Sequence, residues 1–263
     1  MKILLLCVDY NTVNTTKNFL NSILSTNTNF DLSLTCNSGI DGFEGYVDNN
    51  QVHIFDSKDN LGYMEGASQG FKNYLSSNTM PDWIILTNTD VEFDVNQTYN
   101  YLSKLEGNEI LAPAITTLDG VSQNPFLVAR PKKRKIKFLK FVYSYKVLYL
   151  IYNLLFAIKS KLNKNLNYHR EQRLPLNIFA PHGAFVIFPK KYFEKGGDLT
   201  HPTFLYGEEL IIGERAKNLN LPIVYCPEIK ITHHEHVATS SKGGILKAKC
   251  LSNSLKYILK QYY

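Results

Sequence analysis

The first 115 residues alternate between short apolar runs and longer segments of mixed polarity. Ile3–Val8 and Trp83–Thr87 are almost entirely apolar, as is typical of parallel strands buried on both faces. Asp31–Thr35 alternates apolar and polar residues, which also indicates a strand. The predicted elements are strands at Ile3–Val8, Asp31–Thr35, Gln51–Phe55 and Trp83–Thr87, a helix from Asn14 or Thr15 to Leu24, and a helix from the glycine-bearing loop Asn60–Gly66 to Leu75.

Strands that alternate with helices predict a parallel sheet with right-handed crossovers. Ligands of such sheets bind at the edge where the strands end. Each predicted strand is followed by a polar tip, and we expect all the tips to line that edge. The tips are Asp9-Tyr10-Asn11, Cys36-Asn37-Ser38, Asp59-Asn60 and Asn88-Thr89-Asp90.

The second half of the chain has a different pattern. Apolar and aromatic residues between Phe138 and Phe156 recur every three or four positions, which predicts one amphipathic helix. The other elements that we expect are strands at Phe179–Pro189, Pro222–Cys226 and Ile229–Thr232, a turn at Gly196-Gly197, and helices at Glu209–Asn218 and Leu246–Gln261.

Charge divides the chain into unequal parts. The net charge is +6, from 29 Lys and Arg against 23 Asp and Glu. Twelve basic residues and no acid lie between Val121 and Arg170, so the rest has 17 basic and 23 acidic residues. The apolar content excludes a disordered chain and suffices for a full core. We expect one domain, 1–263, that consists of residues 1–115, a basic helical insert at 130–170, residues 171–245 and a closing helix at 246–263.

The cysteine and hydropathy patterns bear on the compartment. The four cysteines form no CxxC pair, and three lie in apolar, strand-like segments, as buried thiols do in a reducing cytosol. The N-terminal apolar run ends at Asp9, too early for the core of a signal peptide. The longest uncharged apolar run, Val147–Ile158, has twelve residues, whereas a membrane span needs about 20. These patterns predict a cytoplasmic protein that is soluble or bound to a membrane surface.

Acidic residues stand at two positions suited to chemistry. Asp90 follows a strand, where a carboxylate either completes a turn or binds a divalent cation. Glu208 and Glu209 come just before a predicted helix, where carboxylates either stabilise the helix start or act as a general base.

A histidine cluster, His233-His234-Glu235-His236, follows a predicted strand. Residues two apart on a strand share a face, so His234 and His236 are expected on one face and His233 on the other. No HExxH or cysteine pattern accompanies the cluster, so we do not expect a structural zinc site. We expect one of the histidines to join Asp90 at a cation or a diphosphate.

Six segments stand in a characteristic order along the chain. They are Val8-Asp9-Tyr10-Asn11, Asn60-Leu61-Gly62-Tyr63 with Gly66 and Gly70, Asn88-Thr89-Asp90-Val91, His182-Gly183-Ala184-Phe185, Gly196-Gly197 with Phe204–Glu209, and Pro227 to His233. Together they resemble the inverting glycosyltransferases of family two, which have the GT-A nucleotide-sugar fold. The rhamnosyltransferase-like, polysaccharide-synthesis branch looks most similar, and the resemblance covers most of the chain outside the basic insert.

The resemblance implies an α/β fold with a mostly parallel central sheet flanked by helices. It also implies an enzyme that moves a sugar from a nucleotide-diphosphate donor to a hydroxyl of a glycan or lipid-diphosphate-linked acceptor in cell-surface polysaccharide synthesis. Glu209 would be the base, with Glu208 as the alternative. Asp90 would bind the divalent cation, Mg²⁺ or Mn²⁺, helped by His233 or a neighbouring histidine. The residues implied in nucleotide-sugar binding are Val8, Tyr10, Asn11, Cys36, Asn37, Asn60, Gly62, Asn88, Thr89, Gly183 and Ala184.

Three positions depart from the family pattern. Cys36 replaces the usual Asp after the second strand, which leaves the choice of nucleobase open. Ser68 replaces the usual Asn. Ile211 replaces the second acid of the ED-x-D pattern, although Arg215 is retained. Because the metal acid and the base are both present, activity is expected.

Pro131–Lys164 combines basic residues with aromatic residues at helical spacing. We expect it to dock the protein on the anionic inner leaflet of the cell membrane and to hold a lipid-linked acceptor there. A solvated basic surface is the simpler alternative. A nucleic-acid binder would use the same stretch, but the chain has no reading motif and we expect no nucleic-acid partner. A sugar nucleotidyltransferase would need a glycine-rich loop after the first strand, which is absent. A catalytically silent family member that serves as a partner subunit stays open.

Overall fold

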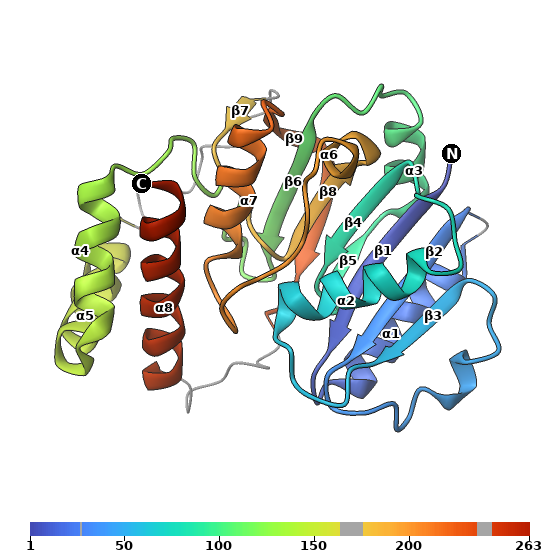
Figure 1. Ribbon diagram of the computed structural model, residues 1–263, viewed down its shortest axis with the longest axis horizontal. Coiled ribbons are helices and arrows are strands. Elements are labelled where there is room, and N and C mark those ends of the chain that lie inside the picture. Colours follow the sequence, from blue (N-terminus) through green and yellow to red (C-terminus); the bar gives the residue numbers. More distant parts are fainter. Residues whose placement is uncertain (27, 164–175, 236–243) are drawn as a thin grey trace.

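The computed structural model describes residues 1–26, 28–163, 176–235 and 244–263. These residues form a mixed α/β structure in which a central nine-stranded sheet is flanked by helices (Figure 1). The C-terminal helix and two helices from the basic insert stand beside the sheet, at the left of Figure 1.

The predicted elements of the first half are confirmed to within two residues at their ends. They are β1 (Ile3–Asp9), α1 (Val13–Leu24), β2 (Phe30–Cys36), β3 (Val52–Asp56), α2 (Tyr63–Leu75) and β4 (Trp83–Thr87). A short 3-10 helix, η1 (Glu44–Tyr46), was not predicted. β1 lies between β2 and β4 and is parallel to both, and β3 continues the sheet beside β2. The carboxyl ends of these four strands therefore share one edge.

The second half completes a mixed sheet. Its elements are β5 (Val91–Phe93), α3 (Val95–Leu102), β6 (Ile110–Thr117), β7 (Leu176–Ile178), β8 (Phe185–Pro189), α6 (Lys190–Glu194), α7 (Glu208–Asn218), β9 (Ile223–His233) and α8 (Gly244–Tyr262). The strand order is β3-β2-β1-β4-β8-β6-β9-β5, with β7 also beside β9. β8 is antiparallel to both β4 and β6, whereas β6 and β9 are parallel.

Two strand predictions in this half are wrong in their boundaries. The strand expected at Phe179–Pro189 begins only at Phe185, because the backbone of Phe179 and Ala180 bonds to Leu127 instead. The two strands expected around Pro227 are one strand, β9. Its register against β6 shifts after Cys226, at the proline, which has no N–H to donate to a ladder.

The basic insert forms two helices rather than the single helix that its periodicity predicts. α4 (Lys133–Ser144) and α5 (Lys146–Asn163) are separated at Tyr145, whose backbone is extended. α4 packs along α8, with Ile136 and Val142 buried. Of the described helices, none combines the length and the apolar character needed to cross a membrane.

An ion pair fixes the start of this helical hairpin. The Arg130 Nε atom lies 2.8 Å from Glu214 Oε1, and Glu214, on α7, is 1% exposed. Arg130 also donates to the backbone carbonyl of Tyr262 at the end of α8 and stacks on the ring of Tyr263. The hairpin is thus tied to both α7 and α8.

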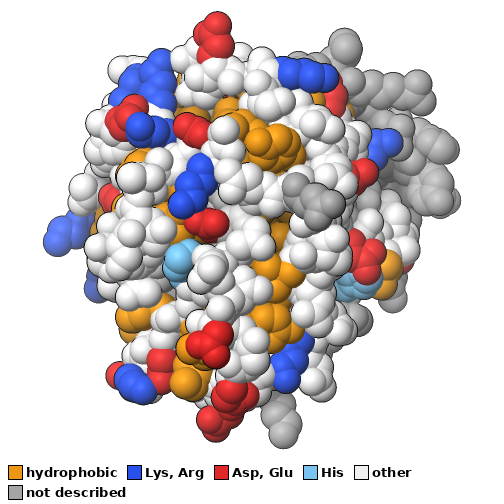
Figure 2. Space-filling view, turned by 90° about the vertical axis from the view of Figure 1, so that its right-hand side faces the viewer, with side chains coloured by type: hydrophobic (Ala, Val, Ile, Leu, Met, Phe, Trp, Pro, Cys, Tyr) orange, Lys and Arg blue, Asp and Glu red, His pale blue; other side chains and the backbone are white. Residues whose placement is uncertain are grey.

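The opposite end of the molecule, at β2 and β3, has an ordinary mixed surface. Figure 2 shows Lys and Arg side chains interspersed with Asp and Glu on this face. Charges of both signs side by side are typical of a solvated surface. The concentration of basic residues is therefore a local property of the hairpin.

Two hydrophobic clusters form the core, one on each face of the sheet. α1 and α3 cover one face with residues such as Phe19, Leu20 and Leu102. α2, α6 and α7 cover the other with residues such as Phe71 and Ile212. Both layers bury alternate residues of the same central strands, as a doubly covered sheet requires.

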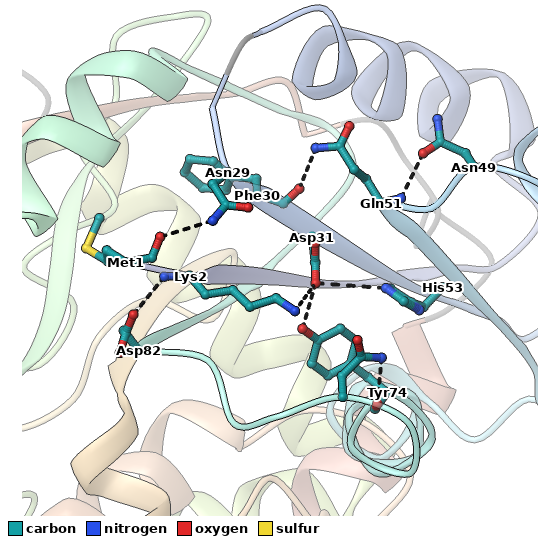
Figure 3. A network of polar contacts seen from close by, with 11 residues as sticks. Met1, Lys2, Asn29, Phe30, Asp31, Asn49, Gln51, His53, Tyr74 and Asp82 are labelled. Carbon is teal, nitrogen blue, oxygen red and sulfur yellow. Dashed lines mark hydrogen bonds and ion pairs between the residues drawn. The ribbon is translucent and has the colours of Figure 1, made fainter.

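A polar network ties together the amino ends of the first strands (Figure 3). Asp31 on β2 pairs with Lys2, with 2.9 Å between the Lys2 Nζ and Asp31 Oδ2 atoms. Tyr74 on α2 donates its hydroxyl to the same oxygen at 2.6 Å, and His53 on β3 lies 3.9 Å away. The network lies at the sheet edge opposite the polar tips, so it supports the fold rather than the candidate site.

We predict that Gly70→Ala destabilises the protein. A Cβ at Gly70 on α2 would lie 2.4 Å from the Thr35 Oγ1 atom and 3.0 Å from the Ser33 Oγ atom, both on buried β2. Overpacking of this kind costs about 1–3 kcal/mol, and better helix propensity offsets about 1 kcal/mol at most. Urea unfolding should therefore show a lower free energy of unfolding.

Gly45→Ala is the matched control, because a Cβ there would meet no atom within 4 Å. It should change the free energy of unfolding by less than about 0.5 kcal/mol. A Gly70→Ala protein as stable as the Gly45→Ala protein would contradict the predicted contact between α2 and β2.

Candidate active site

The polar tips of β1, β2 and β4 meet at one edge, as the sequence predicts. The Asn37 N–H donates to the Asp9 carbonyl at 2.9 Å, which extends the pairing of β1 with β2. The Thr16 hydroxyl bonds to a carboxylate oxygen of fully buried Asp9 and to the Thr89 hydroxyl, at 2.7 and 3.1 Å. Asp9 therefore organises this edge from within.

The loop before α2 is attached to the same edge. The Asn37 side chain donates to the Gly62 carbonyl at 2.9 Å and lies 3.3 Å from the Asn60 side-chain oxygen. Gly62 has a φ of 81°, and a Cβ there would lie 2.0 Å from the Phe204 carbonyl oxygen. Only glycine fits this position. Because Gly62 has no side chain, the backbone of Phe204, in the segment before α7, packs directly against the loop.

The candidate nucleotide-binding residues differ in access. Tyr10 is 44% exposed, and Asn11 is exposed and has a left-handed backbone. Val8 is half-buried beside Gly66. Cys36 is fully buried in the core, and burial raises the pKa of its thiol to about 12. Its side chain thus stays uncharged and faces the core.

Strand pairing brings Asp90 and His233 together. β5 pairs antiparallel with β9, with Val91 opposite His233. The Asp90 Oδ1 and His233 Nε2 atoms are 3.3 Å apart, and the Asn88 amide nitrogen is also 3.3 Å from the same ring nitrogen. The other ring nitrogen of His233 lies 2.8 Å from the Gln123 side-chain oxygen.

The neighbouring histidines are placed differently. The His234 ring lies 3.0 Å from Glu92, through its Nε2 atom and the Glu92 Oε1 atom. The backbone N–H of His234 donates to the Asp90 carbonyl at 2.9 Å. His236 lies outside the described residues. The rings of His233 and His234 contact different residues, as strand alternation predicts, and of these two described histidines His233 is the one whose ring meets Asp90.

A carboxylate and an imidazole at this spacing fit a divalent cation. Two ligands at about 2.1 Å from one octahedral cation lie about 3 Å apart, close to the 3.3 Å found here. Among the described residues, no group of three or more His, Cys, Asp or Glu is arranged to hold a metal ion.

Glu208 and Glu209 begin α7, after the left-handed residues Tyr206 and Gly207. Burial raises the pKa of Glu208. Burial, and then the charge of Glu208, raise the pKa of Glu209 to about 8. A helix start favours carboxylate anions, so desolvation outweighs the helix dipole here. A carboxylate that is costly to ionise is a good proton acceptor near neutral pH.

Tyr63 and Gly183 lie between the two acidic parts of the site, the Glu208–Glu209 pair and Asp90. A Cβ at Gly183 would lie 3.4 Å from Glu209 Oε1, and the Tyr63 hydroxyl donates to the Gly183 carbonyl at 3.2 Å. Burial, and then charges that include those of Glu208, Asp90 and Glu209, raise the pKa of Tyr63. The proposed metal acid and the proposed base therefore both act on the pKa of one half-buried tyrosine.

Four residues near the site have no assigned role in the sequence prediction. His182 is neutral, because burial and then His233 lower its pKa to about 4, and its Nδ1 atom accepts from the Ala184 N–H. Gln123 orients His233 from a loop, and no local pattern signals it. Tyr63 and His182 stand inside recognised motifs. Lys247 on α8 lies over the Tyr206 ring, 5.3 Å from its centre, and its charge lowers the pKa of Glu209.

Sequence comparisons find no relative. No family model matches the chain. No curated protein matches it either.

The fold is similar to that of solved glycosyltransferases. GalNAc-T7 in a crystal structure with UDP, GalNAc and Mn²⁺ aligns with a TM-score of 0.59 and 12% identity over 90% of this chain and 44% of its own. S. aureus TarS 1–349 in complex with UDP-GlcNAc aligns with a TM-score of 0.54 and 12% identity, over 97% of this chain and 66% of its own. A second crystal structure of S. aureus TarS 1–349 aligns with a TM-score of 0.52 and 10% identity, over 89% of this chain and 60% of its own.

These similarities show that the chain has the GT-A fold predicted from its motifs. The chain spans between 44% and 66% of the length of these solved chains. At 10–12% identity, these similarities show the fold and not membership of family two or of the rhamnosyltransferase-like branch.

We predict that Glu209→Gln stabilises the protein at pH 8. The folded-state pKa of Glu209, about 8, exceeds that of an unfolded glutamate, about 4.3. The folded state then binds more protons between these values, so stability falls as pH rises through that window. Glutamine does not ionise, so the Tm at pH 8 should exceed that of the wild type by about 2–6 °C.

At about pH 3, below both pKa values, the two proteins should melt together, because Glu209 is then protonated in the folded and in the unfolded state. The exposed Glu106 provides the control, and Glu106→Gln should leave the Tm unchanged at both pH values. Equal melting of Glu209→Gln and wild type at pH 8 would show that Glu209 is not buried as described.

Proposed function

We propose that the protein is an inverting glycosyltransferase that uses a nucleotide-diphosphate sugar as donor. The observation that carries the proposal is the pairing of Asp90 with His233 at one end of the site and the packing of Glu209 against Gly183, whose carbonyl accepts from Tyr63. Two of the similar solved structures contain UDP or UDP-GlcNAc, which supports a nucleotide-sugar donor here.

The donor binds along the carboxyl edge of the sheet in this proposal. Tyr10, Asn11 and Asn37 hold the nucleobase and the ribose, and the exposure of Tyr10 and Asn11 supports that role. Asp90 and His233 hold a divalent cation, which neutralises charge on the diphosphate when it is bound. Gly183 and Ala184 line the sugar, next to Asn88, whose N–H donates to the Ala184 carbonyl.

Glu209 is the general base in this proposal. Its carboxylate takes the proton of the acceptor hydroxyl as that oxygen attacks the anomeric carbon. The bond from this carbon to the diphosphate breaks on the opposite side, and the diphosphate leaves with the electron pair. One displacement inverts the anomeric centre. The raised pKa of Glu209 supports this role.

The acceptor is a hydroxyl of a glycan or of a lipid-diphosphate-linked saccharide, and the enzyme works in cell-surface polysaccharide synthesis at the inner face of the cell membrane. The basic hairpin supports this location. Lys247 supports the acceptor class, because its ammonium group lies over the Tyr206 ring, close to the start of α7, where it could pair with an acceptor phosphate.

We predict that a nucleotide sugar raises the Tm of the protein only in the presence of Mn²⁺ or Mg²⁺. A panel of UDP-, GDP- and dTDP-sugars, each with and without the metal, identifies the donor. Asp90→Ala and His233→Ala should each abolish the metal-dependent shift. His234→Ala is the matched control, since the His234 ring contacts Glu92 and the backbone N–H that donates to the Asp90 carbonyl is kept in alanine. If no donor shifts the Tm, the proposed function is wrong.

We predict that Glu209→Gln lowers kcat by about 10²–10⁴-fold, the usual contribution of a general base. The donor-induced Tm shift should stay as in the wild type, because the change spares the cation pair. With the wild-type enzyme, kcat/KM should rise with pH and level off above about 8. Glu208→Gln tests the alternative base. Full turnover by Glu209→Gln would assign the base elsewhere.

A further inference from the structure

α5 turns a stripe of aliphatic side chains away from the protein. Six large apolar residues of this helix are between 48% and 66% exposed. They recur every three or four positions, so they share one face of the helix. The stripe consists of Val147, Leu150, Ile151, Leu154, Leu155 and Ile158. In a globular protein such a stripe normally faces the core.

The inner face of the hairpin is already occupied. Tyr149 is 6% exposed, and its ring contacts Tyr143 of α4. Tyr152 also contacts Tyr143, and α4 packs on α8. Aromatic residues therefore fill the inward side of α5, and no described residue covers its aliphatic side. An exposed apolar patch of this size marks an interaction surface.

The charges around the stripe indicate what covers it. Seven basic residues precede the stripe in the chain, on α4 and at the helix junction, and no acid lies between Val121 and Arg170. They are Lys132, Lys133, Arg134, Lys135, Lys137, Lys140 and Lys146. A second copy of the chain would bring like charges together, which disfavours a dimer through this face. Nucleic acid is held by aromatic stacking and phosphate contacts, and it would leave the aliphatic stripe in water.

We propose that α5 lies flat in the surface of an anionic lipid bilayer. The stripe Val147–Ile158 enters the boundary between headgroups and acyl chains, and the lysines of α4 contact the anionic headgroups. Exposed Phe138 and Phe141 on α4 add apolar contacts among these lysines. The inference rests on the proposed location at the membrane and is independent of sugar transfer.

α8 connects this surface to the candidate active site. It packs against both helices of the hairpin and against α7. A Cβ at Gly207, directly before Glu208, would lie 2.9 Å from the Ser254 Cβ atom of α8. In a protein seated on the bilayer through α5, α8 thus links the membrane surface to the start of α7, where Glu208 and Glu209 stand.

Flotation with vesicles tests the proposal on the full chain. Wild-type protein should float with vesicles of phosphatidylcholine and phosphatidylglycerol and much less with pure phosphatidylcholine. Leu150→Asn/Leu154→Asn should lower the ratio of bound to free protein by at least about tenfold, because two buried leucines are lost from the bilayer. Lys137→Gln/Lys140→Gln should weaken binding to the anionic vesicles only.

Leu118→Asn/Val121→Asn is the matched control. These residues are also exposed, at 65% and 49%, but lie outside the hairpin. This variant should bind vesicles as the wild type does. Each variant exchanges exposed side chains, so all should fold, and unchanged circular dichroism and Tm check this.

Failure of the wild type to float, or equal binding by the Leu150/Leu154 variant, would overturn the proposal. So would a wild-type dimer in sedimentation that the same variant dissociates, or a gel shift with DNA by a protein that binds no vesicles. The donor-induced Tm shift needs no lipid. A shift without flotation rejects the membrane surface alone, and flotation without any shift rejects the proposed function alone.

Discussion

The candidate site depends on the direction of one strand. β8 runs antiparallel to β4, with Phe185 opposite Thr87, so β8 begins where β4 ends. The pairing continues past both strands, since the Asn88 N–H donates to the Ala184 carbonyl at 2.9 Å. A parallel strand in this position would carry its first residues to the other edge. The antiparallel pairing brings Gly183 and Ala184 to the carboxyl ends of β1, β2 and β4.

Burial sets the chemistry of the site. Glu208 and Glu209 start a helix whose N–H groups and dipole favour negative charge, yet desolvation keeps both pKa values raised. The close contacts at Gly62 and Gly183 remove space that water would fill. Asp90 is held differently, in a polar pair with His233. Two carboxylate environments in one site suit two tasks, proton transfer and cation binding.

The same division between buried and exposed surfaces organises the hairpin. Arg130 anchors it through a nearly buried ion pair with Glu214, and α8 supports it along its length. Loss of Arg130 would leave a desolvated charge on Glu214, whose side chain is 2% exposed. The outward face of α5 remains aliphatic between basic residues, whereas the far end of the molecule mixes both charges (Figure 2). The average charge of +6 describes neither end.

Local periodicity in the sequence predicts much of the fold. β1 to β4 and the helices α1 and α2 follow from it, because burial on both faces imposes continuous apolar runs and short polar tips. The same pattern predicts that Asp90 and the Glu208–Glu209 pair lie at element ends. It misses the break at Tyr145, because the three- and four-residue spacing continues unchanged from α4 into α5.

Contacts between residues far apart in the chain decide the rest. Whether β8 runs parallel or antiparallel, and whether Pro227 ends a strand or bulges within one, depends on β4 and β6 rather than on local sequence. His233 rather than His234 faces Asp90 because β5 pairs with β9 in one register. The sequence by itself determined which residue types stand at the ends of elements, since that requires only local burial. The tertiary structure decided which of them meet, since strand pairing and desolvation act across the whole chain.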